Sequence, residues 1–480
     1  MSIPAFASAV EMARDLRSCQ ISSVELLEHL LDRINKYNPP LNALVTIDAE
    51  AARQRAREAD QALARGEIWG PLHGLPVTVK DVFETRGLRS TAGYLPLAEN
   101  IPQQDAAAVV RLRDAGAIIL GKSNTPPIAS DFQTDNPIFG RTNNPWDPTR
   151  TSGGSSGGGA AAVAAGLSYL DLCSDLSGSI RIPAHFCGVY GFIPTDGRVP
   201  RDGHLPRQSP GNTVGRLLRV GLLARSVDDL RLALPVIAGP SMLEPDVPPV
   251  PLSAPPPSGL TGLRIAWTVD VDGTPVCASI RSALEAFAQR LAAAGCHVER
   301  VSPAGFDFPL ARQVHNRIFL TTLAAQMPAL PRFIARTLGG MQAFDLNLPK
   351  YLKAETQRAA LSAEMEAFLG QWDAWICPVT STPAFLHHAP SGYFGPTPYY
   401  KKPIEVDGRP LDYYAATSNF TIPFNVTGHP VVVIPIDQTP QGLPIGAQIV
   451  GRRWSDPALL ETAACLAEVV GGWNPPPGYA

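Results

Sequence analysis

Two Gly/Ser-rich loops separated by an Ala-rich segment constrain this chain more than any other feature. The stretch spans residues 151–195 and reads TSGGSSGGGAAAVAAGLSYLDLCSDLSGSIRIPAHFCGVYGFIPT. Loops this dense in glycine let backbone N–H groups approach a ligand closely, with hydroxyls set among them. The alanines of 160–165 favour a helix between the loops. The pattern singles out Ser155 and Ser179, one serine in each loop, as candidate reactive hydroxyls.

Lys80 stands far upstream, in the context GLPVTVKD, where the apolar run predicts a strand over 77–79 that ends at the lysine. A lone lysine after an apolar strand is usually solvated. A desolvated, neutral amine, however, can accept a proton from a hydroxyl. Together with the two serines, Lys80 indicates a serine hydrolase whose base is a lysine in place of a histidine.

Composition is typical of a soluble enzyme and excludes several classes. Of the 480 residues, 45% are hydrophobic and 17% are charged, which argues against disorder. The net charge of −3 gives no electrostatic footprint for nucleic acid or anionic lipid, so we expect neither as a partner. We see no cationic leader and no apolar window long enough to span a membrane. The seven cysteines never form CxxC, which favours free thiols in a reducing compartment, and hence the cytoplasm.

Helical patterns alternate with short apolar strands along the chain, which predicts an α/β fold with helices on the faces of a sheet. We expect one domain over 1–480, with the proline-rich stretch crossing its surface rather than separating two domains. Its parts are a helical N-terminal region (1–66), a catalytic core (70–200), a Pro-rich linker (239–259), a variable substrate-side region (260–400) and a C-terminal return to the core (412–480). Within the substrate-side region, residues 309–370 are expected to be mostly helical.

Two motif matches are weak. Gly116-AIIL-Gly121-Lys122-Ser123 fits the phosphate-binding pattern GxxxxGK[ST], but its four central residues read as a buried strand and the prolines after it forbid the required helix. A P-loop-like nucleotide-binding protein is therefore a minor alternative. Gly153-x-Ser155-x-Gly157 formally fits GxSxG, but no strand precedes it, as a nucleophile elbow requires.

The nine histidines show no metal-ligand spacing, so we expect no metal. His185, six residues after Ser179, is a candidate base, although its apolar neighbours favour local packing instead.

The motifs GLPVTVKD, GRTNNPWDPTRTSGGSSGGGAAAVAAG, SDLSGSIRIPAHFCGVYGFIPT, FNVTGHPVVVIPI and GLPIGAQIVGRRW resemble, in this order, those of the amidase signature family. The resemblance covers nearly the whole chain. It implies the fold of that family, with a central mixed β-sheet flanked by helices on both faces. It also implies hydrolysis through a Ser–cis-Ser–Lys triad, without metal or cofactor.

Carried over onto this sequence, the resemblance assigns roles to matching positions. Ser179 aligns with the nucleophile, Ser155 with the bridging serine after a cis peptide bond, and Lys80 with the base. Backbone N–H groups of the second loop would form the oxyanion hole, Ala129 and Ser130 would line the acyl side of the substrate pocket, and three residues would support the site. The oxyanion residues are Leu176, Ser177, Gly178 and Ser179, and the supporting residues are Ser156, Asp175 and Arg181.

Three positions depart from the family pattern. Ser177 stands where glycine is usual in the oxyanion loop, which adds a side chain but keeps the N–H. Pro127 replaces a frequent glutamate, and Ile193 replaces a frequent lysine. None is a triad position, so these departures bear on the substrate pocket.

We expect an amidase that cleaves the C–N acyl bond of small to medium, apolar or aryl amides through an acyl-enzyme on Ser179. The aromatic stretch 387–410 and the helical residues 309–370 would shape the pocket. The same chemistry could also cleave esters and carbamates, including urethanes. The sequence is compatible with a homodimer. The alternatives are an amidotransferase A-type subunit that delivers ammonia to a partner and, from another class, a catalytically idle binding protein.

Overall fold

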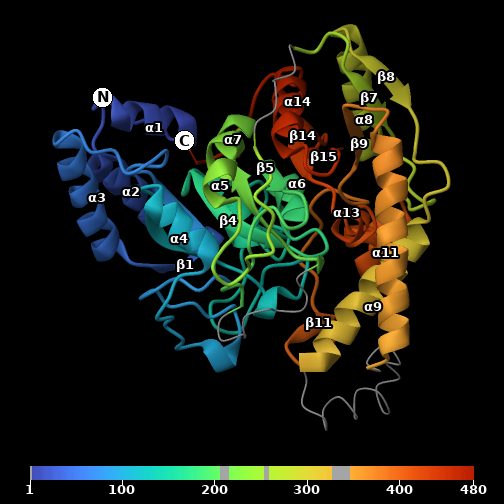
Figure 1. Ribbon diagram of the computed structural model, residues 1–480, viewed down its shortest axis with the longest axis horizontal. Helices are drawn as coiled ribbons and strands as arrows, with labels where there is room; N and C mark the ends of the chain where they lie inside the picture. The colour runs from blue at the N-terminus through green and yellow to red at the C-terminus, as the bar shows by residue number, and fades with distance from the viewer. Residues whose placement is uncertain (1–2, 206–215, 253–258, 327–345, 480) are drawn as a thin grey trace.

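The computed structural model describes residues 3–205, 216–252, 259–326 and 346–479. Within them, eleven strands form one mixed sheet with flanking helices, which confirms the predicted fold class (Figure 1). In spatial order they are β1 Leu44–Ile47, β3 Ile118–Ser123, β2 Pro76–Lys80, β4 Leu170–Asp175, β6 Arg219–Ala224, β5 Tyr190–Ile193, β14 Val431–Gln438, β15 Pro444–Val450, β9 Ala374–Pro378, β7 Arg264–Trp267 and β8 His297–Arg300.

Both faces of the central strands are covered. Consecutive residues of β2, β3, β4, β5, β6 and β15 are all buried, although successive side chains of a strand point to opposite faces. The helices that flank the sheet are α1 Ala9–Arg17, α2 Ser23–Leu41, α3 Ala49–Ala64, α4 Ala107–Asp114, α5 Gly157–Ala164, α6 Arg181–Cys187, α7 Val227–Ile237, α8 Ala278–Ala293, α9 Phe308–Gln326, α11 Leu348–Leu369, α12 Tyr413–Ser418, α13 Ile422–Thr427 and α14 Asp456–Glu468.

The N-terminal region is not wholly helical, which corrects the prediction for 1–66. Helix α2 continues through Pro39 and Pro40 to Leu41, and the chain then forms the edge strand β1, which pairs antiparallel with β3. The run LVTI is short and β-branched, so it suits an edge strand. Three helices therefore surround one strand in this region.

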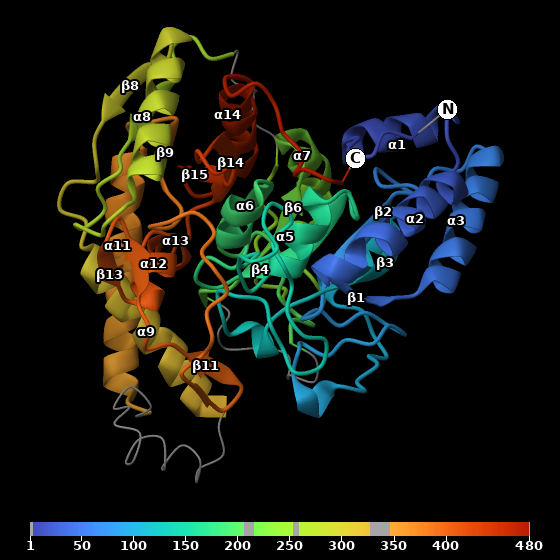
Figure 2. The same cartoon turned by 180° about the vertical axis from the view of Figure 1, so that it is seen from behind.

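Segments far apart in sequence meet at the middle of the sheet. Strands β14 and β15, from the C-terminal part, lie between β5 and β9 and pair with both in antiparallel register. The two ends of the chain also lie near one another, beside α1 and α7 (Figures 1 and 2). There the rings of Phe6 and Trp473 are 5.4 Å apart.

The predicted substrate-side region forms two long helices and two small hairpins. Helices α9 and α11 pack on each other and on α13, while residues 327–345 of the predicted helical stretch lie outside the described residues. The aromatic stretch 387–410 contains three short strands and the start of a fourth: β10 Gly392–Phe394, β11 Thr397–Tyr399, β12 Ile404–Val406 and β13 Arg409–Leu411.

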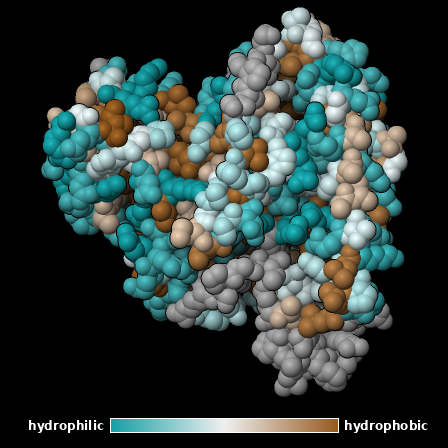
Figure 3. Space-filling view, in the orientation of Figure 1, coloured by the Kyte–Doolittle hydropathy of each residue, from teal (hydrophilic) through white to brown (hydrophobic). Residues whose placement is uncertain are grey.

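The next feature is the length and polarity of the helices and of the surface they form. None of the described helices is long and apolar enough to cross a bilayer. The face in Figure 3 is mostly hydrophilic over the N-terminal helices, and apolar side chains are visible over α9 and α11. Leu348 and Leu352, at the start of α11, are exposed.

Candidate active site

The structure brings Lys80 and Ser155 together inside the protein. Lys80 is the last residue of β2, and its Nζ donates a hydrogen bond to Ser155 Oγ at 2.6 Å. Both side chains are fully buried, and the peptide bond from Gly154 to Ser155 is cis, as the resemblance implied. Burial lowers the pKa of Lys80 to about 8, although the acidic groups of Cys173, Asp175 and Asp171 oppose this shift. A substantial share of the lysine is thus neutral near pH 8 and able to accept a proton.

Glycine is required where the first Gly/Ser loop passes its neighbours. A Cβ on Gly154 would lie 2.6 Å from the carbonyl oxygen of Asp131, and one on Gly157 would lie 2.4 Å from Thr134 Oγ1. Such distances leave no room for any larger residue. Because of this close approach, the backbone around Asp131 is fixed directly against the Ser155 loop.

Ser179 lies just before α6, and Ser156 joins it to the first loop. The Ser156 N–H donates to the carbonyl oxygen of Ser179 at 3.1 Å, and Ser156 Oγ donates to the Ser174 carbonyl at 3.4 Å. Ser179 is 6% exposed, whereas Lys80 and Ser155 are not exposed at all. Within the described residues, no hydrogen bond joins the side-chain oxygens of Ser155 and Ser179. Of Lys80, Ser155 and Ser179, Ser179 is therefore the one residue with any exposed surface.

The predicted oxyanion loop is partly committed to Asp175. The Gly178 N–H donates to Asp175 Oδ1 at 2.8 Å, and the Ile180 N–H donates to Oδ2 at 2.9 Å. The Gly178 N–H, one of the four donors predicted for the oxyanion hole, therefore has an anionic acceptor in this structure. The N–H groups of Leu176, Ser177 and Ser179 have no acceptor among the described residues.

Asp175 and Arg181 form a buried pair that holds the second loop. The guanidinium donates to both carboxylate oxygens, from Nη2 at 2.8 Å and from Nε at 3.1 Å. Burial would raise the pKa of Asp175, but the charge and hydrogen bonds of Arg181 outweigh it and lower the pKa to about 2. Arg181 also donates to the Thr421 carbonyl at 2.7 Å and to Gln448 Oε1 at 3.0 Å. The loop is thus anchored to the C-terminal part of the chain, in keeping with the supporting role predicted for both residues.

Sequence reasoning missed Asp171 of β4, which lies beneath Lys80. Its carboxylate accepts from Thr78 Oγ1 at 2.5 Å and from Ser123 Oγ at 3.1 Å, and its charge favours the protonated form of Lys80. Along β4, Asp171, Cys173 and Asp175 alternate with other residues, so they share one face of the strand. This period-two pattern of polar residues was the signal that could have identified Asp171.

Two histidines from other segments also reach the site. His204 Nε2 lies 2.9 Å from Ser174 Oγ. His315 of α9 places Nε2 3.0 Å from Ser177 Oγ and 3.2 Å from the Leu176 carbonyl oxygen. Ser177, one of the three departures from the family pattern, and the Leu176 carbonyl are thus the points at which His315 of α9 contacts the second Gly/Ser loop. No motif in the sequence pointed to either histidine.

His185, the histidine nearest to Ser179 in sequence, faces elsewhere. Its Nδ1 accepts from the Gly446 N–H at 2.7 Å, and its Nε2 lies 3.3 Å from the Thr382 carbonyl oxygen. Burial lowers the pKa of His185 to about 4. The ring joins α6 to β15 and is a packing residue, as its neighbours in sequence favoured.

Ala129 and Ser130 are partly exposed and lead into an aromatic cluster around Asp131. Tyr400 and Tyr413 donate hydrogen bonds to the Asp131 carboxylate, at 2.6 and 2.8 Å, and their rings stack at 4.0 Å. Burial raises the pKa of Asp131 to about 6, although the tyrosine hydroxyls oppose this shift. This cluster lies beside the first Gly/Ser loop because the backbone of Asp131 approaches that loop so closely.

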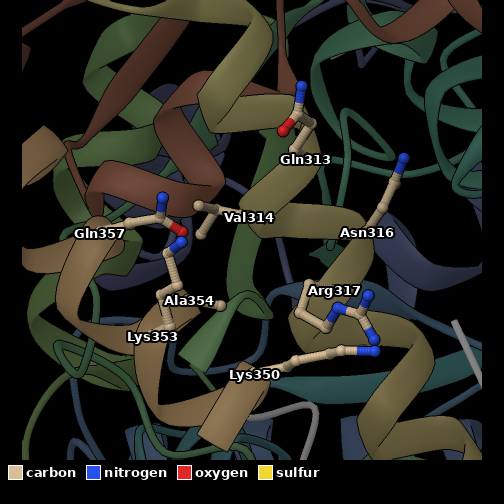
Figure 4. A pocket seen from close by; sticks show the side chains of 8 residues that line it. All are labelled: Gln313, Val314, Asn316, Arg317, Lys350, Lys353, Ala354 and Gln357. Carbon is tan, nitrogen blue, oxygen red and sulfur yellow. The ribbon is translucent and has the colours of Figure 1, made fainter. Parts of the chain in front are cut away.

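A cavity of about 430 Å³ lies between α9 and α11 (Figure 4). Its lining comes from the two helices alone: Gln313, Val314, Asn316, Arg317, Lys350, Lys353, Ala354 and Gln357. The lining includes none of the predicted triad or oxyanion residues. Among the described residues, no group of three or more His, Cys, Asp or Glu side chains could hold a metal ion.

Comparisons with known proteins agree with this arrangement. The family model described as Amidase matches residues 25–460. The chain is 32% identical to an acylamidase of Rhodococcus erythropolis, over 97% of this chain and 96% of that protein. It is 35% identical to the A-type subunit of the glutamyl-tRNA(Gln) amidotransferase of an Anaeromyxobacter species, over 95% of each. A solved bacterial aryl acylamidase of the amidase signature family superposes with a TM-score of 0.82 at 26% identity, over 97% of this chain and 96% of that one. The chain belongs to the amidase signature family, whose members it matches in sequence and fold from end to end, and it is an amide C–N hydrolase.

Proposed function

We propose that this protein hydrolyses small to medium, apolar or aryl amides through an acyl-enzyme on Ser179. The observation that carries the proposal is the 2.6 Å contact between Lys80 Nζ and Ser155 Oγ in a fully buried position beside Ser179. A serine hydroxyl is a poor nucleophile until a base removes its proton. A lysine whose pKa lies near 8 can do so close to neutral pH.

In the proposed mechanism the proton of Ser179 passes to Ser155 Oγ, while Ser155 gives its own proton to Lys80. Ser179 Oγ then bonds to the substrate carbonyl carbon, and the negative charge on the carbonyl oxygen is stabilised by the N–H groups of Leu176, Ser177 and Ser179. Each aligned donor lowers the barrier by about 3 kcal/mol. The proton returns through Ser155 to the leaving amine as the C–N bond breaks, and water attacks the acyl-enzyme by the same route.

The substrate class rests on the surroundings of the first Gly/Ser loop. Tyr400, Tyr413 and Phe132 cluster around Asp131, and the ring of Tyr414 lies 6.3 Å from that of Phe132. Tyr414 is exposed, whereas the other three rings are buried. An aromatic wall beside a reactive hydroxyl suits an apolar or aryl group on the substrate. A relative and a solved neighbour named as acylamidases support the same class. Esters and carbamates with such groups are further proposed substrates.

The test is active-site labelling combined with a substrate screen. A fluorophosphonate should modify Ser179, and Ser179→Ala should abolish both labelling and the hydrolysis of anilides. Ser18→Ala, which removes an exposed hydroxyl at the end of α1, is the matched control and should label normally. Full labelling of Ser179→Ala would refute the role of Ser179 as the nucleophile. Hydrolysis of short aliphatic amides in preference to anilides, esters and carbamates would refute the substrate class.

An ammonia-producing subunit is the second candidate, because an amidotransferase A-type subunit is among the relatives. Such a protein would release ammonia from glutamine and co-purify with a partner. Glutaminase activity that exceeds anilide hydrolysis, together with a stable complex, would favour this candidate.

A further inference from the structure

Lys80 Nζ has three oxygen neighbours, and a neutral amine must divide its hydrogens among them. Ser155 Oγ lies at 2.6 Å, Ser174 Oγ at 3.4 Å and the Ser174 carbonyl oxygen at 3.5 Å. A neutral amine carries two N–H groups and one lone pair. For Lys80 to accept the proton of Ser155, its lone pair must face Ser155 Oγ. Both N–H groups must then point to the two oxygens of Ser174.

The Ser174 hydroxyl can accept a hydrogen bond from the Lys80 amine only if the Ser174 proton points away from that amine. Ser174 has two directions for its proton, toward the lone pair of Lys80 or toward His204 Nε2, which lies 2.9 Å from Ser174 Oγ. In the first direction Ser174 occupies the lone pair that Ser155 needs. In the second, Ser174 Oγ accepts from Lys80 and the lone pair stays free. An unprotonated His204 Nε2 therefore selects the productive arrangement.

From this count we infer that His204 is a positioning residue for the catalytic lysine. It acts through Ser174, whose hydroxyl it holds as a donor to the ring and an acceptor toward Lys80. The inference rests on the proposed role of Lys80 as base and adds a residue to that site.

The backbone fixes His204 at this place. The Leu205 N–H donates to the Val82 carbonyl at 2.7 Å, and the Glu84 N–H donates to the Gly203 carbonyl at 2.8 Å. The ring packs edge-on against Phe83, with centroids 5.3 Å apart. His204 is 6% exposed, and its Nδ1 is buried with no partner among the described residues. In the part of the chain that the structure describes, the Ser174 hydroxyl is thus the one hydrogen-bond partner of this buried ring.

The charges around the pair keep the ring neutral. Burial and the neighbouring Lys80 lower the pKa of His204 to about 3, so the ring is neutral throughout the working pH range. A neutral ring carries its proton on one nitrogen, and the inferred arrangement requires this proton on Nδ1, which leaves Nε2 as the acceptor. The groups that face Lys80 are Asp171, Cys173 and Asp175 of β4, and they are the same in every variant described below.

Removal of the ring nitrogen is the first test. In His204→Phe the Ser174 hydroxyl is released and donates to Lys80, which stabilises the neutral amine but blocks its lone pair. We expect the plateau kcat for an anilide to fall by about tenfold, the effect of one misplaced hydrogen bond, and the pH at half-maximal rate to move downward. His204→Gln, whose amide oxygen can also accept from Ser174, should recover most of the rate and the original pH profile.

The deciding test is the double variant Ser174→Ala/His204→Phe. If the loss in His204→Phe comes from the Ser174 proton, removal of that hydroxyl should relieve it, so the double variant should be faster than His204→Phe and match Ser174→Ala. Thermal melting of each variant separates this effect from unfolding. Losses that add in the double variant, or an unchanged pH profile in His204→Phe, would overturn the inference. Ser179→Ala should remain inactive in either case. If it hydrolyses anilides, the proposed function fails and not this inference alone.

Discussion

Two buried lysines on adjacent strands make an instructive pair. Lys80 of β2 and Lys122 of β3 are both fully buried, and burial lowers the pKa of each to about 8. Val79, not Lys80, pairs with Lys122 across the parallel strands, so the two side chains point to opposite faces of the sheet. The Lys80 amine reaches Ser155 in the first Gly/Ser loop, and the Lys122 amine reaches a turn after β2.

The hydroxyls that the two lysines contact differ in one respect. Thr85 Oγ1 accepts from Lys122 Nζ at 2.8 Å, but its own proton is directed to the Phe83 carbonyl at 3.2 Å. Ser155 Oγ accepts from Lys80, and no other acceptor among the described residues takes its proton. If the proposed mechanism holds, a lowered pKa alone does not make a lysine a base. The partner hydroxyl must also have a proton to give.

Replacement of each amine by an isosteric apolar chain gives the largest expected difference. Lys80→Met should lower kcat by about 10³–10⁴-fold, because no other basic group among the described residues contacts Ser155 Oγ. Lys122→Met should leave kcat within about fivefold and lower the free energy of unfolding by about 1–3 kcal/mol, since Phe83 and Thr85 lose their donor. Steady-state kinetics and chemical denaturation measure the two effects. Equal losses of kcat in both variants would remove the distinction.

Asp175 sharpens the comparison, because it is buried like the lysines but has a direct ionic partner. Asp175→Asn leaves Arg181 buried without its counter-charge and should lower the free energy of unfolding by about 3–5 kcal/mol. The folded-state pKa of Asp175 lies below its unfolded value, so its stabilisation is present above about pH 4 and is lost as the pH falls toward 2. Acid unfolding of the variant should lack this contribution. Unchanged stability at pH 7 would contradict the role of the pair.

The pH dependence of the rate assigns the titrating amine. Lys80 must be neutral to act, so kcat should rise about tenfold per unit below pH 8 and level off above it. Lys122→Met should show the same profile, because Lys122 takes no part in the reaction. A flat profile between pH 6 and 9, or one that moves in Lys122→Met, would count against Lys80 as the base.

The smallest effect is expected at the hydroxyl beside Lys122. Thr85→Val removes one acceptor and should cost about 1 kcal/mol of stability while kcat stays unchanged. Ser155→Ala is the corresponding change beside Lys80 and should cost as much activity as Lys80→Met. A Thr85→Val variant that loses activity more than tenfold would show that the second lysine also supports catalysis.

The sequence predicted the parts of the fold and site that depend on local pattern. The run GLPVTVK was expected to end a strand at Lys80, and β2 ends there. The helix between the loops begins three residues earlier than predicted, because buried glycines 157–159 join α5. The edge strand β1 was missed because a four-residue run within helical neighbours gives little periodic signal.

Contacts between distant segments could not be predicted in the same way. His204 and His315 reach the site from segments 30 and 138 residues away from their partners Ser174 and Ser177. Neither position carries a motif, and the backbone bonds that place them form only in the folded chain. The hydrogen bond from the Gly178 N–H to Asp175 could not be predicted for the same reason, because it depends on where the Asp175 carboxylate points.

The position of the C-terminal strands in the sheet has a consequence for biosynthesis. Strands β14 and β15 separate β5 from β9, and Gln448 of β15 holds Arg181 beside the second loop. A nascent chain that has not yet released these strands from the ribosome exposes two unpaired sheet edges and a guanidinium without its full set of acceptors. We therefore expect hydrolytic competence only once β15 has emerged, and we expect a proteolytic fragment that lacks this strand to be inactive and prone to aggregate.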